Sequence, residues 1–239
     1  TEQGIPSHYD YWLGYYTEQI KYIIDEDLDQ TELRRNEWLD YLNPNPDLNQ
    51  VRDVVVGPLI TTSWDQGNPY NVMCPGTPPT LVGCVSISMS QVMHYWKYPD
   101  YAVGTESYND PSGESPSFGT IVSNFGTPYD WDNMPNTGAT EDTQLLLFEA
   151  GVAVHMDYDY DGSGSHVDWG SNSAQRAMKE NFDYVNSSGG YPVARNKSAY
   201  SSTAWQTIII NELDSGKPMI KQGCGDTGCH AWNIDGYDE

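Results

Sequence analysis

The most informative part of this sequence is the segment Gly83-Cys84-Val85-Ser86-Ile87-Ser88-Met89-Ser90-Gln91-Val92-Met93. Apolar residues recur there at helical spacing, and Pro99 cannot continue a helix, so we expect an amphipathic helix that begins at Cys84. A thiol at a helix N-terminus meets unpaired N–H groups and the positive end of the helix dipole, which favour its thiolate form. Cys84 is therefore a candidate nucleophile. The alternative is a small buried core residue, which most free cysteines are.

A nucleophilic cysteine needs a base, and the sequence contains five histidines. His94 lies in the same predicted helix as Cys84, several turns away, and cannot reach the thiol. His230 opens a predicted strand 146 residues after Cys84, and a separation of about 130–150 residues between Cys and His is typical of papain-like peptidases. His230 is thus the candidate general base. The alternative is a histidine whose hydrogen bonds are satisfied within a sheet.

A third candidate residue lies upstream, in the turn Trp64-Asp65-Gln66-Gly67. Acyl transfer requires hydrogen-bond donors directed at the oxyanion that develops on the substrate. We expect the side-chain amide of Gln66 and the backbone N–H of Cys84 to be those two donors. Taken alone, Gln66 would be an ordinary turn residue.

Hydrophobic periodicity and the positions of Pro and Gly predict the remaining elements. Helices precede strands along the chain, which is the pattern of the α+β class. The expected helices span residues 9–43, 143–151, 173–182 and 204–213, and the expected strands span 51–62, 101–107 and 152–154, with a hairpin at 219–222 and 230–234.

The chain is strongly acidic, with 11 Lys and Arg against 34 Asp and Glu and a net charge of −23. This charge argues against binding to nucleic acid or to an anionic membrane surface, because both need a basic protein face. No apolar run approaches the roughly 20 residues that span a bilayer. The composition is acidic, rich in Tyr, Trp, Asn, Gly and Ser and poor in Lys, which is typical of exported proteins, so we expect a secreted protein in which disulfides are permitted.

The four cysteines leave two alternatives open at the turn between Cys224 and Cys229. These residues either form a disulfide that closes a hairpin or remain as two thiols beside a tight turn. A zinc site made of Cys224, Cys229 and His230 is disfavoured, because an adjacent Cys and His rarely bind the same tetrahedral ion.

An acidic loop is the other candidate for a metal site. Asp157, Asp159 and Asp161 alternate before Gly162, and Asp168 occupies the twelfth position, as in a calcium-binding loop. The closing residue is Asp instead of the longer Glu, which disfavours bidentate binding. Calcium is a candidate ligand of this loop, and the alternative is a solvated acidic surface.

Five motifs occur in one order and together resemble the streptopain-like cysteine peptidases, a secreted bacterial branch of the papain-like fold. They include the Gln66 turn, the Cys84 helix and His230-Ala231-Trp232-Asn233-Ile234-Asp235-Gly236, and they lie at residues 64–71, 83–93, 151–158, 177–182 and 230–236. The resemblance implies an α+β papain-like peptidase fold whose helical part carries Cys84 and whose antiparallel sheet carries His230.

What this resemblance implies for function is the hydrolysis of peptide bonds through a thioacyl intermediate. Cys84 would be the nucleophile, His230 the general base and later acid, and Gln66 an oxyanion donor, with no cofactor required. Protein or peptide substrates would be the partners, with an apolar side chain preferred one residue before the residue that contributes the scissile carbonyl. The family's counterpart of the acidic loop carries no metal.

The resemblance also implies a zymogen. Residues 1–48 would be the tail of an inhibitory propeptide or an N-terminal helical segment, and residues 49–239 the peptidase domain. The Asn-Trp-Gly-Trp motif that orients the imidazole in the family is expected some tens of residues after His230, so the sequence ending at Glu239 reads as truncated. The alternative function is a non-catalytic calcium- or carbohydrate-binding module on a degenerate peptidase scaffold.

Overall fold

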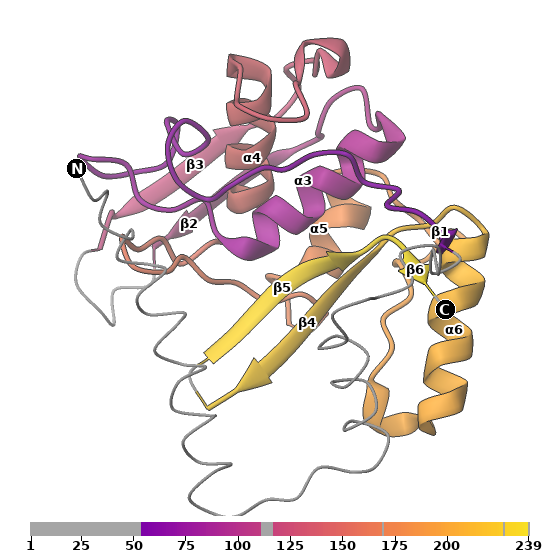
Figure 1. Ribbon diagram of the computed structural model, residues 1–239. Helices are drawn as coiled ribbons and strands as arrows, with labels where there is room; N and C mark the ends of the chain where they lie inside the picture. Colours follow the sequence, from indigo (N-terminus) through magenta and orange to yellow (C-terminus); the bar gives the residue numbers. More distant parts are fainter. Residues whose placement is uncertain (1–53, 111–116, 169, 227, 239) are drawn as a thin grey trace, which may run out of the picture. The chain divides into compact units, whose positions relative to one another are not determined.

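The computed structural model describes residues 54–110, 117–168, 170–226 and 228–238 (Figure 1). The chain divides into two units, residues 1–51 and 52–239, and all described residues belong to the second. The helix expected at residues 9–43 lies outside the described residues. The boundary expected between residues 48 and 49 stays a prediction.

Helix α3 (Cys84–Trp96) lies at the centre of the described unit, between α4 (Glu141–Ala153) and a β-hairpin (Figure 1). The hairpin consists of β4 (Met219–Gly225) and β5 (Gly228–Ile234). The other elements are β1 (Val54–Val56), which pairs with β6 (Tyr237–Asp238), β2 (Thr105–Asn109), which pairs with β3 (Thr120–Asn124), α5 (Ala174–Glu180), α6 (Ser202–Asp214) and two 3-10 turns at Trp131–Asn133 and Lys197–Ala199. Helices and antiparallel strands are thus combined in one unit, as expected.

The core of this unit is built around the contact between α3 and α4. Met89 and Met93 of α3 and Leu146 and Leu147 of α4 are fully buried. Burial of each such side chain contributes about 1.5–3 kcal/mol to folding. The buried Ser86 hydroxyl donates to the Leu147 carbonyl over 2.6 Å, so the polar group of α3 that enters this contact is satisfied. Cys84 is therefore carried by the best-anchored helix of the described unit.

The β4–β5 hairpin follows the predicted pairing and extends it by several residues. Its register runs from Met219 opposite Ile234 to Gly225 opposite Gly228. Cys224 and Cys229 are directly opposite and form a disulfide, which settles the open alternative at this turn. A zinc site that uses both thiolates is thereby excluded in this oxidised state. Side chains alternate between the two faces, with Ala231 buried and Trp232 exposed.

Three expected strands differ from the structure. Residues 152 and 153 belong to α4, because an apolar run buried on all sides has no period that distinguishes helix from strand. The strand expected at 51–62 is confined, among the described residues, to Val54–Val56, and Pro58 shortly after it has no N–H to donate to a ladder. The strand expected at 101–107 begins later, at Thr105.

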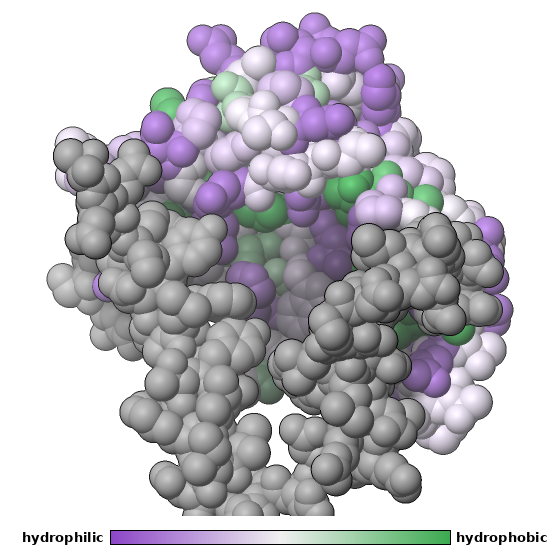
Figure 2. All heavy atoms as spheres, viewed as in Figure 1, coloured by the Kyte–Doolittle hydropathy of each residue, from purple (hydrophilic) through white to green (hydrophobic). Residues whose placement is uncertain are grey.

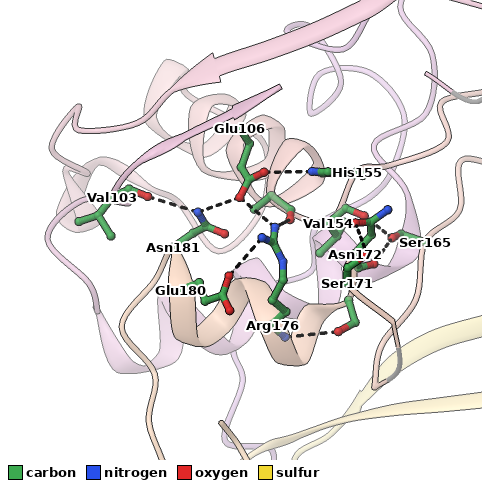
Figure 3. Close-up of polar contacts among 12 residues, drawn as sticks. Val103, Glu106, Val154, His155, Ser165, Ser171, Asn172, Arg176, Glu180 and Asn181 are labelled. Atoms are coloured by element: carbon green, nitrogen blue, oxygen red, sulfur yellow. Dashed lines mark hydrogen bonds and ion pairs between the residues drawn. The ribbon is translucent and has the colours of Figure 1, made fainter. Parts of the chain in front are cut away.

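A polar cluster joins β2, the end of α4 and α5 (Figure 3). Glu106 accepts hydrogen bonds from His155 Nε2 at 3.0 Å, Arg176 at 2.9 Å and Asn181 at 3.3 Å, and all three side chains point toward it. Desolvation raises the pKa of Glu106, but the bonds from His155 and Arg176 outweigh it and lower that pKa below its ordinary value. Because His155 begins the acidic loop, the cluster anchors one end of that loop.

The part of the chain that the structure describes contains no helix with the length and apolar character needed to cross a membrane.

Candidate active site

Cys84 is the first residue of α3, and the residue before it is glycine for a steric reason. Gly83 has φ of 92°, in the region that favours glycine. A Cβ atom on Gly83 would lie 2.5 Å from Met156 Sδ and 3.2 Å from the Ser163 carbonyl oxygen. As the N-cap residue, Gly83 has no side chain to bond the first N–H groups of the helix. Those groups therefore remain available to a ligand beside the Cys84 thiol.

The hairpin meets α3 at the thiol itself. The backbone N–H of Ala231 donates a hydrogen bond to Cys84 Sγ over 3.4 Å. Further along β5, Asn233 Nδ2 donates to Gln91 Oε1 at 3.1 Å, and Gln91 Nε2 donates to the Thr62 carbonyl at 2.8 Å. These side-chain bonds attach the strand that carries His230 to the helix that carries Cys84.

Gln66, Cys84 and His230 line one cleft of about 420 Å³. Its apolar lining consists of Leu81, Val85 and Val167, and its polar lining includes Asp161 and Gln222. Figure 2 shows the described residues hollowed between the helical part and the hairpin, where apolar and hydrophilic residues adjoin. The three residues chosen from the sequence thus come from separate segments and meet at one cavity.

The thiol and the imidazole are not hydrogen-bonded to each other in this arrangement. Among the described residues, the donor to Cys84 Sγ is the N–H of Ala231. His230 immediately precedes Ala231 in β5 and lines the same cleft as Cys84. Catalytic hydrogen bonds are often long or unformed without substrate, so this geometry is consistent with a Cys–His pair.

The Gln66 turn is fixed by backbone bonds to the segment that leads into α3. Val82 N–H donates to the Gln66 carbonyl at 2.9 Å. The indole of Trp64 donates to the Pro135 carbonyl at 2.8 Å and lies in the core. The backbone of Gln66 is therefore fixed beside the segment that leads into α3, and Gln66 lines the cleft.

The acidic loop forms part of the cleft wall, through residues 161–165 and Val167. Asp157 and Gly164 exchange two backbone hydrogen bonds, and Leu81 N–H donates to the Asp159 carbonyl. Within the described ranges, no three His, Cys, Asp or Glu side chains are grouped so as to hold an ion. The calcium site expected at Asp157, Asp159, Asp161 and Asp168 stays a prediction.

The sequence did not reveal every group at the cleft. The Ala231 N–H and the Gln222 side chain were both missed, and Gln222 Oε1 is buried without a hydrogen-bond partner among the described residues. The available signal was the two-residue period of the hairpin, since Gln222 is opposite Ala231 and so on the same face.

His94 is half-buried and Cys74 is buried, and neither of them lines the cleft. His94 Nε2 is 3.1 Å from the Met134 carbonyl, and its ring packs against Trp64. Cys74 is a free thiol like Cys84, but it is buried, and burial raises its pKa to about 12. Cys84 is therefore the free thiol at the cleft.

The chain is similar to known cysteine peptidases. Residues 64–239 match the Peptidase C10 family. The chain is 30% identical to streptopain of Streptococcus pyogenes over 215 residues, which is 79% of this chain and 52% of that protein. It is 27% identical to the thiol protease/hemagglutinin PrtT of Porphyromonas gingivalis, over 82% of this chain and 24% of that protein. The chain spans about half the length of the streptopain sequences it matches.

Two solved structures are also similar. Active interpain A cysteine protease of Prevotella intermedia has a TM-score of 0.63 and 29% identity, with 77% of each chain covered. A fragment of prointerpain A from the same organism has a TM-score of 0.62 and 26% identity, with 88% of this chain and 72% of that chain covered.

Proposed function

The chain belongs to the peptidase C10 family, and on that premise we propose that it acts as a secreted cysteine endopeptidase. The observation that carries the proposal is the cleft on which Cys84, His230 and Gln66 converge from three segments of the chain. In this proposal Cys84 is the nucleophile, His230 is the general base and then the general acid, and Gln66 with the Cys84 N–H binds the oxyanion.

The proposed reaction has two steps. Cys84 Sγ attacks the carbonyl carbon of a peptide bond while His230 takes the thiol proton, and the negative oxygen is bound by the Gln66 amide and the Cys84 N–H. His230 then protonates the leaving amine, which leaves a thioacyl enzyme. Water, deprotonated by His230, attacks that thioester, and the acid product and the free thiol are released. Side chains and backbone groups of this chain supply every group that these steps use.

Features of the cleft also support a preference for apolar side chains near the scissile bond. Leu81, Val85 and Val167 contribute its apolar lining. An apolar substrate side chain buried there would gain about 25 cal/mol for each Å² removed from water. The proposal therefore includes unfolded proteins or peptides with apolar residues as substrates.

Export and control by a propeptide complete the proposal. A disulfide between Cys224 and Cys229 is compatible with an oxidising compartment. One structural neighbour is a fragment of a proprotein, prointerpain A. The N-terminal residues 1–48 would then act as part of an inhibitory segment until removed.

The test uses the full chain, purified without added metal and assayed with casein and with quenched fluorescent peptides before and after limited proteolysis that removes the inhibitory segment. We expect cleavage that is lost on Cys84→Ala and on His230→Ala, whereas Cys74→Ala, which removes the buried free thiol, retains it. We also expect iodoacetamide to label Cys84 in mild acid in a manner that depends on His230. Cleavage that survives Cys84→Ala would refute the assignment, and so would labelling of Cys84 that is unaffected by His230→Ala.

A further inference from the structure

We propose that Asp161 makes this cleft select substrates that carry a Lys or Arg side chain near the scissile bond. This inference rests on the proposed peptidase function and names a substrate class for it. Asp161 was singled out in the sequence as a candidate calcium ligand, and it lines the same cleft as Cys84 and His230.

Asp161 differs in charge from the rest of the cleft. Among the described residues that line the cavity, it is the only Asp, Glu, Lys or Arg. It is exposed, and no ion pair joins its carboxylate to a Lys, Arg or His within the described residues. The carboxylate is thus a negative charge at the cleft without a positive partner in the described unit, and a cationic substrate side chain would supply one.

The backbone that carries Asp161 is held close to the nucleophile. Asp161 N–H donates to Asp159 Oδ1 at 2.9 Å, and Asp159 N–H donates to Ser163 Oγ at 3.0 Å. Ser163 Oγ in turn donates to the Leu81 carbonyl at 2.7 Å, three residues before Cys84. The backbone at Asp161 is therefore tied to the segment that leads into Cys84, and selection at a single substrate position requires such a fixed attachment of the charged side chain.

The far end of the loop is anchored as well. Ser165 Oγ donates to the Val154 carbonyl at 2.6 Å, and the neighbouring His155 is bonded to Glu106 at 3.0 Å (Figure 3). Because both ends of the loop are tied to the helical core, its tip stays at the cleft wall. A charge at such a tip acts on one part of a bound peptide and not on its whole length.

Whole-molecule charge and local charge have separate effects on selection. The net charge of −23 attracts any cationic peptide and raises its encounter rate. Only a charge at the cleft discriminates between peptides of equal charge whose Lys occupies different positions. Exposed ion pairs are weak, so we expect a preference of about 1.5- to fivefold in kcat/KM at the selected position.

The experiment uses quenched fluorescent peptides of constant net charge in which a Lys, a Met or a Glu occupies each of the three positions on either side of the scissile bond, with compensating residues at the far ends. We expect one position at which kcat/KM falls in the order Lys, Met, Glu. Asp161→Asn should remove this Lys preference of about 1.5- to fivefold and leave Met peptides unchanged, and Asp161→Lys should invert the order. Asp130→Asn, which neutralises an exposed acid outside the cleft lining, should change nothing.

The outcomes separate this inference from the peptidase assignment. If cleavage requires Cys84 but Asp161→Asn leaves the Lys-to-Met ratio unchanged at every position, the Asp161 inference is wrong and the proposed function stands. If cleavage survives Cys84→Ala, the proposed function is wrong. The Cys84→Ala chain allows the affinities of the Lys and Met peptides to be compared without cleavage, through their dissociation constants. Equal dissociation constants for the two peptides would also overturn the inference.

Discussion

The backbone N–H of Ala231 and the Sγ atom of Cys84 are joined by a hydrogen bond of 3.4 Å across the contact between β5 and α3. The strand fixes the position of this backbone donor, so the bond ties the position of the hairpin to that of the thiol. His230 is the next residue in that strand, and its distance from the thiol is set by the same contact.

Ala231→Val should therefore impair the site more than the fold. Ala231 is only 4% exposed, so two added methyl groups must push β5 away from α3. Overpacking of this kind costs about 1–3 kcal/mol of stability, and we expect kcat/KM to fall at least about tenfold because the proposed mechanism needs close approach of His230. Ala199→Val makes the same change at an exposed position and should be neutral. Normal activity of Ala231→Val would show that the contact does not position the site.

Alkylation should distinguish the four cysteines without any activity assay. Under non-reducing native conditions, we expect iodoacetamide to modify Cys84 first, whereas Cys74 reacts only after unfolding because it is buried and its pKa is raised to about 12. Cys224 and Cys229 should react only after reduction. Peptide mass spectrometry measures each site in the same sample, so the cysteines serve as controls for one another. Rapid native labelling of Cys74 would contradict its burial.

Gly83→Ala should destabilise the protein and disturb the start of α3. The added Cβ meets Met156 and the Ser163 carbonyl, and a non-glycine residue at φ of 92° is strained. We expect a loss of about 1–3 kcal/mol in urea unfolding. Adding Met156→Ala should recover only part of the loss, since the backbone strain remains. Gly225→Ala, where no atom lies within 4 Å of the added Cβ, is the control and should cost little.

Gln66→Ala tests the oxyanion donor. Removal of one such donor in acyl-transfer enzymes lowers kcat by about 10²–10³, and we expect a loss of that order with a much smaller change in KM. Stability should hardly change, because the backbone carbonyl of Gln66, and not its side chain, bonds Val82. The exposed Gln206→Ala is the matched control. A raised KM with normal kcat would assign the amide to substrate binding instead.

Glu149 should make stability depend on pH. It is 1% exposed and accepts a hydrogen bond from Tyr129, and desolvation raises its pKa from 4.5 to about 7. A carboxyl with a raised folded-state pKa favours folding fully below pH 4.5, and the benefit is lost as pH rises to about 7. The loss amounts to about 3 kcal/mol. Relative to Glu149→Gln, the unmodified chain should therefore lose urea stability across this range, and parallel profiles would rule out the raised pKa.

Local pattern was sufficient for the elements that carry the site, and insufficient for the contacts between them. The apolar period after Cys84 predicted α3, and alternation predicted the hairpin. The same reasoning failed at residues 152 and 153, where complete burial removes the polar face on which a helical period depends.

At the cleft, too, the sequence predicted individual residues but not the contacts between distant segments. Cys84, His230 and Gln66 were chosen by residue type, spacing and resemblance, and they line one cavity. The Ala231 N–H left no trace in the sequence, because any residue except proline offers that donor. The spacing of Asp161 fits a calcium-loop template, but nothing in the sequence indicated that this residue lines the cleft with Cys84, because that depends on contacts between distant segments.

The hairpin contributes little to the shared core: among its described residues, Ala231 is the one buried apolar residue there, and the partly buried Ile220 packs against it. Within the described residues, the proposed nucleophile and base thus lie on two elements, α3 and β5, that are joined by few hydrogen bonds. A contact of this kind between β5 and α3 opens at a lower free energy than the one needed to unfold the helical core. On gentle heating, the proposed peptidase activity should therefore be lost while the circular dichroism spectrum is still that of the native fold. On cooling, the activity should return as β5 and α3 regain their contact.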